Sequence, residues 1–157
     1  MRVATTAAYI RTQAAVAGLI NFVVNPAIDW LSLRHKGAQP IWGADGLVVN
    51  FVITSLILST LVGIFAQWGV RREEKAGRVH SRNASSSRWL HRLPRRGWVA
   101  GPVLGAAAAV VVIALFWALH GLGMTKWSLA ALMAVKAVYC GLLGFLVARW
   151  VISRHLA

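Results

Sequence analysis

The sequence is poor in charged residues, above all in acidic ones. Only 13% of its 157 residues are charged and Asp and Glu together number 4, whereas a soluble domain carries about a quarter charged residues. It contains no paired-carboxylate site, P-loop, zinc pattern or bis-histidine haem pattern. We therefore expect no metal and no cofactor, and the lack of a catalytic set favours a protein that is not an enzyme.

Cysteine is also scarce. The single cysteine, Cys140, excludes an internal disulfide. Because it lies within a long apolar run, we expect it to be a small packing residue.

Hydrophobic residues are abundant instead. They make up 58% of the chain, the mean hydropathy is +0.62, and four apolar blocks each approach or exceed the ~20 residues that cross a bilayer as a helix. The blocks are residues 12–33, 46–69, 98–119 and 127–152. The sequence thus predicts an all-α integral membrane protein, a four-transmembrane-helix bundle forming one membrane domain over residues 1–157.

Basic residues are concentrated in the connection 70–97, which holds nine of the 17 Lys and Arg residues. We expect it to be a flexible loop. This connection and the Arg residues near both ends of the chain together hold 13 of the 17 basic residues, and they lie on the same side of the membrane if the chain crosses it four times. The positive-inside rule therefore predicts that both termini are cytoplasmic. We expect the membrane to be that of a bacterial cell. No nucleic-acid-binding fold accompanies this charge, and we expect anionic lipid headgroups to contact Arg88, Arg92, Arg95 and Arg96.

The connection between the first two blocks is rich in turn-forming residues such as Gly37, Pro40 and Gly43. This composition argues against a buried strand there.

Polar residues interrupt the first apolar block. Asn21, Asn25 and Asp29 follow one another at intervals of four, which keeps them near one face of a helix. Pro26 cannot donate to the Phe22 carbonyl, so we expect a kink there and an asparagine that satisfies the exposed acceptor.

Polar residues of three apolar blocks lie at similar depths below the outer surface of the membrane, when depth is counted from the outer end of each helix at 1.5 Å per residue. Asn25, Thr54 and Lys136 come out at roughly 12 to 14 Å, and Asp29 and Asn50 at roughly 6 Å. This predicts a polar pocket in the outer leaflet. The candidate binding residues are Asn21, Asn25, Asp29, Asn50, Thr54, Lys136 and Tyr139.

Lys136 is the costliest of these residues to bury, at about 2.5 to 3.5 kcal/mol if it is unpaired near the bilayer centre. We expect it to reach Asp29 or Asp45 and to hydrogen-bond Asn25 on the way. Two interpretations stay open: a wet pocket that contacts an ion or polar headgroup, and an inert buried ion pair that fixes helix register.

Small residues recur at spacings of three and four in every block and predict close helix packing. The packing residues are Gly18, Ser55, Ser59, Gly63, Gly101, Gly105, Gly141 and Gly144. Gly18 and Trp30 match Gly105 and Trp117 at equal separation, which suggests two parallel helical-hairpin repeats or a chance similarity.

Two functions fit these patterns. The first is a small permease, transporter or channel that binds a polar or ionic species in the outer-leaflet pocket, as a single copy or as a homodimer. The second is an accessory or scaffold subunit of a larger membrane complex, which would bind its partner through the glycine and alanine faces and use the polar cluster only for structure.

Overall fold

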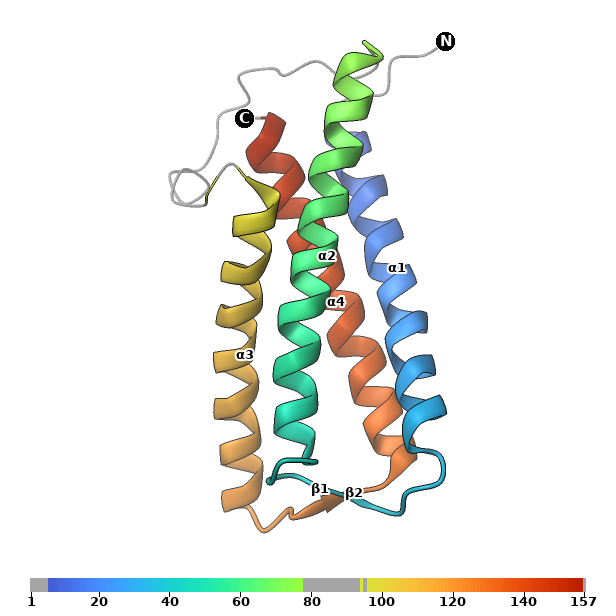
Figure 1. Ribbon diagram of the computed structural model, residues 1–157, viewed down its shortest axis with the longest axis vertical. Coiled ribbons are helices and arrows are strands. Elements are labelled where there is room, and N and C mark those ends of the chain that lie inside the picture. The colour runs from blue at the N-terminus through green and yellow to red at the C-terminus, as the bar shows by residue number, and fades with distance from the viewer. Residues whose placement is uncertain (1–5, 78–93, 95, 157) are drawn as a thin grey trace.

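The protein is a bundle of four long helices in the computed structural model, which describes residues 6–77, 94 and 96–156. The helices are α1 (Thr6–Leu33), α2 (Leu47–Lys75), α3 (Gly97–Gly121) and α4 (Leu129–Leu156). All four are long and apolar enough to cross a membrane, which confirms the predicted class and indicates a multi-pass membrane protein. α1 begins and α4 ends at the same end of the bundle, here called the terminal end (Figure 1).

Helix α2 is longer than the predicted apolar block. Charged residues end the block at Gly69, but the helix continues to Lys75. Val70 explains the extension, because it is fully buried against Ala14 and Ile152 at the terminal end. The first part of the predicted flexible loop is therefore helical, and 78–93 lies outside the described residues.

The helices associate as two pairs. α1 packs along α4, and α2 packs along α3. Contacts between α2 and α4 join the pairs, whereas α1 and α2 touch each other only slightly, and the α3–α4 contact is also small. Figure 1 shows α4 behind the space that separates α1 from α2. Neither predicted hairpin, α1–α2 or α3–α4, is thus a closely packed pair.

Glycines allow both close pairings. A Cβ atom on Gly18 would lie 3.0 Å from the Gly141 carbonyl oxygen across the α1–α4 contact. On the α2–α3 contact, a Cβ atom on Gly63 would lie 2.6 Å from the Gly97 carbonyl oxygen, and one on Gly105 would lie 2.7 Å from a backbone oxygen of α2. Real Cβ atoms essentially never come within 3.0 Å of another heavy atom, and a distance of 3.0 Å is itself tight. The small residues therefore set these interhelical distances.

A short antiparallel ladder closes the other end of the bundle, here called the ladder end. Strand β1 (Gln39–Pro40) pairs with β2 (Lys126–Trp127). The predicted absence of a buried strand in the first connection is therefore wrong, because Gln39 is buried and Ile41 is fully buried. The composition of the loop could not reveal this ladder, since the pairing partner lies in a distant connection.

An aromatic cluster fills the core beneath the ladder. Phe51 of α2 packs edge-on against Phe116 of α3 at a centroid distance of 5.2 Å, and its ring lies 5.3 Å from that of Tyr139 in α4. Trp127 of β2 covers Phe116 at 5.5 Å. Aromatic packing thereby joins α2, α3 and α4 on one side of the polar residues described below.

We predict that Gly101→Ala destabilises the bundle. The added methyl group would lie 2.5 Å from the Ser59 carbonyl oxygen, and such overpacking typically costs about 1 to 3 kcal/mol. The matched control is Gly121→Ala in the same helix, where an added Cβ atom meets nothing within 4 Å. Thermal unfolding of the two variants in detergent should lower the midpoint only for Gly101→Ala; equal midpoints would contradict the close α2–α3 contact.

Candidate polar binding site

Lys136 is the centre of the polar cluster. It lies in the second turn of α4 and its side chain is almost completely buried, with 1% of the residue exposed. Its ammonium group forms an ion pair with Asp29 Oδ2 of α1 and donates a hydrogen bond to Asn50 Oδ1 of α2. The ring of Phe51 lies 5.5 Å from the same nitrogen. One lysine therefore connects three helices.

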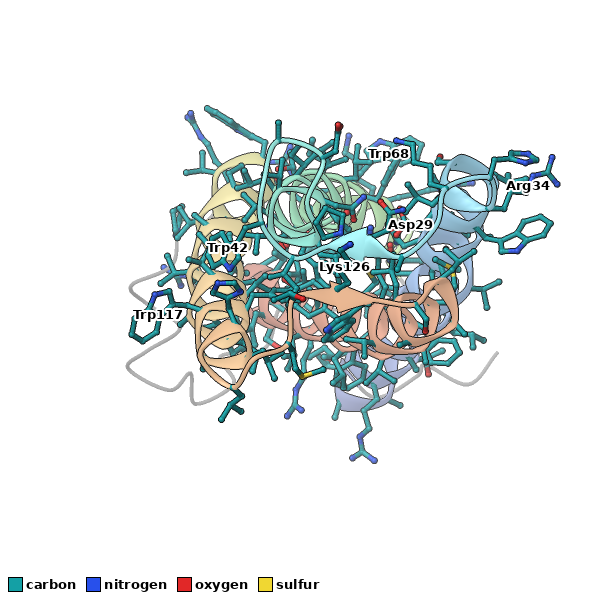
Figure 2. The ribbon with its side chains drawn as sticks, turned by 90° about the horizontal axis from the view of Figure 1, so that it is seen from below. Asp29, Arg34, Trp42, Trp68, Trp117 and Lys126 are labelled. Atoms are coloured by element: carbon teal, nitrogen blue, oxygen red, sulfur yellow. The ribbon has the colours of Figure 1, made fainter. Side chains whose placement is uncertain are left out.

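The directions of the helices bring these groups together. α1 ends at the ladder end, while α2 and α4 begin there, so the last turns of α1 face the first turns of the other two. Figure 2 shows Asp29 on the inner side of α1, whereas Arg34 and Trp117 project away from the bundle. Asp29 is only 7% exposed, and the ion pair with Lys136 supplies the partner that a buried carboxylate requires.

The asparagines of α1 form a chain along the helix. Asn21 Nδ2 donates to the Ala17 carbonyl at 2.8 Å, and Asn25 Nδ2 donates to Asn21 Oδ1 at 3.0 Å. The predicted bond from Lys136 to Asn25 is thus replaced by the bond to Asn50. Neither amide reaches the Phe22 carbonyl, and Pro26 lies within one continuous helix.

Tyr139 belongs to a separate hydrogen-bonded group on the side of the aromatic cluster. Ser55 Oγ donates to the Phe51 carbonyl at 2.6 Å and lies 2.5 Å from the Tyr139 hydroxyl. A serine has only one hydroxyl hydrogen, so Tyr139 must be the donor to Ser55. Ser55, predicted only as a packing residue, therefore also anchors Tyr139, and Tyr139 does not line the hollow described next.

A hollow of about 410 Å³ opens between α1 and α2 beside the ion pair. Its polar lining consists of Asn21, Asn25, Asp29, Thr54 and Lys136. The structure thus brings five of the seven predicted binding residues to one cavity, and Asn50 holds Lys136 from the neighbouring side.

Apolar side chains form the two rims of this hollow. They are at least 45% exposed and recur at every fourth position on each helix. The rim residues are Ile20, Val24 and Ile28 on α1, and Ile53, Ile57, Leu61 and Phe65 on α2. These residues and Phe51 were not among the predicted binding residues, although the four-residue spacing of the rims is present in the sequence beside the asparagines.

Of the four residues predicted to contact lipid headgroups, Arg88, Arg92 and Arg95 lie outside the described residues. The fourth, Arg96, immediately precedes α3 and is exposed. The backbone N–H of Gly97 donates to Gln67 Oε1 at 2.6 Å, so a buried side chain of α2 caps the first turn of α3.

Comparisons with known proteins give no relative: no family model, no curated protein and no solved structure matches the chain. Within the described ranges, no three His, Cys, Asp or Glu side chains are placed to hold a metal ion. Functional inference therefore depends on the geometry of the cluster and of the hollow beside it.

We predict that the two charges of the cluster are strongly coupled. Asp29→Leu leaves the Lys136 ammonium buried without its counter-ion and should cost about 3 to 5 kcal/mol. Lys136→Met should also be destabilising, whereas the double variant should recover most of the loss because no unpaired charge remains. A double-mutant cycle by reversible unfolding measures the coupling; additive losses would contradict a direct ion pair.

Proposed function

We propose that the protein is a small permease-type membrane protein that binds a polar or ionic group at the Asp29–Lys136 pair. The observation that carries this proposal is that the buried pair borders a hollow instead of closed helix packing. A ligand entering the hollow meets the Lys136 cation and the Asp29 anion, which pair with each other when no ligand is bound. A ligand that carries both a positive and a negative group can replace both partners without leaving a buried charge unpaired.

The weak contact between α1 and α2 supports a ligand-binding role. The ion pair itself joins α1 to α4, which pack closely, but both of its residues also line the hollow that the slight α1–α2 contact leaves. A pair with a structural role alone needs no cavity beside it, whereas this pair borders one.

The orientation in the membrane is part of the proposal. The first residues of α1, the last of α4 and the helix ends that flank the basic connection lie at the terminal end, and the positive-inside rule favours a cytoplasmic location for it. The membrane we propose is that of a bacterial cell. The ion pair, near the ladder end, then lies in the outer leaflet.

The accessory-subunit alternative has less support from the geometry. It requires glycine faces that are free to bind a partner. Gly18, Gly141 and Gly144 are used in the α1–α4 contact, and Gly63, Gly101 and Gly105 in the α2–α3 contact.

We predict that water enters the hollow. In a Cys140→Ala background, Asn25→Cys and Thr54→Cys should react with a charged, membrane-impermeant thiol reagent, because both positions line the hollow. Val111→Cys, 66% exposed on α3, is the matched control at a comparable depth and should stay unreactive in lipid.

The labelling is measured on protein in vesicles, with Gly37→Cys in the exposed loop as the fully reactive reference. If positions 25 and 54 are as unreactive as position 111, the hollow is dry and the binding function is contradicted.

A further inference from the structure

The polar lining of α1 extends far beyond the ion pair. Going back from Asp29 in steps of four gives Asn25, Asn21, Ala17, Gln13 and Tyr9, and all of these positions line one of two hollows. Only Ala17 has no polar side chain, and its carbonyl accepts the bond from Asn21. A polar stripe therefore follows α1 from the ladder end to the terminal end.

The two hollows are parts of one groove. The second, of about 270 Å³, lies nearer the terminal end between α1 and α2, with α4 as its floor. Both hollows are lined by Ile20, Asn21, Val62 and Phe65. From Tyr9 to Asp29 the stripe rises about 30 Å at 1.5 Å per residue, which equals the thickness of the hydrocarbon core of a bilayer.

We propose that the groove carries the headgroup of a zwitterionic phospholipid between the two leaflets while its acyl chains remain in the bilayer. The exposed apolar rims suit the chains, and the polar stripe suits a headgroup that would otherwise cross hydrocarbon. This inference rests on the proposed function and names its substrate class.

Charge complementarity selects a zwitterion. Lys136 and Asp29 are the only Lys, Arg, Asp or Glu side chains among the described residues that line the groove. A phosphate can take the place of Asp29 on Lys136 while an ammonium group takes the place of Lys136 on Asp29, so four charges exchange partners and none is left alone. A purely anionic headgroup would leave the Asp29 carboxylate without a counter-ion.

The test uses the full chain in phosphatidylcholine vesicles with a trace of phosphatidylethanolamine carrying a fluorophore on its acyl chain. Dithionite quenches only the outer leaflet, so movement of the lipid appears as quenching beyond the half seen without protein. We expect this further quenching with the native protein. An Asn25→Leu/Thr54→Val variant should move the lipid about tenfold more slowly, because losing one hydrogen bond to the headgroup raises the barrier to crossing by about that factor.

The matched control is Thr60→Val in the same helix. Its hydroxyl donates to the Leu56 carbonyl within α2, and Thr60 lines neither hollow. This variant should move lipid at the native rate. Circular dichroism and a single elution peak show that each variant is folded. Acyl-labelled phosphatidylglycerol should move more slowly than phosphatidylethanolamine.

Three results would overturn the inference: no quenching beyond half, equal rates for the groove variant and Thr60→Val, or equally fast movement of phosphatidylglycerol. Thiol labelling separates these failures from failure of the proposed function. If Asn25→Cys reacts while lipid does not move, the pocket is wet and binds another polar species; if it does not react, both proposals are wrong.

Discussion

The buried ammonium group of Lys136 is the constraint on which the rest of the structure depends. A lysine in the membrane must find an anion and a further acceptor, and here they come from two different helices, Asp29 of α1 and Asn50 of α2. This requirement fixes the positions of three helices at the ladder end. The aromatic cluster under the ladder then excludes lipid from one side of the lysine, while the groove leaves the other side accessible.

The division of the bundle into two glycine-packed pairs has a functional consequence. Close packing of α1 on α4 and of α2 on α3 uses up the small residues, so α1 and α2 have no complementary faces with which to close on each other. The space between them becomes the groove, with polar groups at its base and branched apolar side chains at its rims. Packing that stabilises the pairs is thus also what keeps the site open.

Much of the fold and part of the site could be predicted from the sequence. The rise per residue of a helix is fixed, so counting depth matched Asp29 with Asn50 and placed Lys136 deeper. The expected reach of the lysine stem toward Asp29 agrees with the observed ion pair, whereas its bond to Asn50 was not predicted. Rotation about the helix axis is not fixed by counting, and for this reason Asn25 was assigned to Lys136 although its amide bonds Asn21. The β1–β2 ladder and the extension of α2 past Gly69 depend on contacts between distant segments. Local composition does not encode such contacts.

The most direct test of the central claim is water contact at Lys136, measured by water-edited solid-state NMR of the protein in bilayers with its lysine side chains labelled with 15N. The chain has four lysines, of which Lys36, Lys75 and Lys126 are exposed and give the reference for full hydration. If the buried ammonium group borders a wet groove, magnetisation should pass from water to Lys136 at a rate close to that reference. A Lys136 signal that receives no magnetisation from water, while the other three do, would contradict the account and leave the ion pair with a structural role alone.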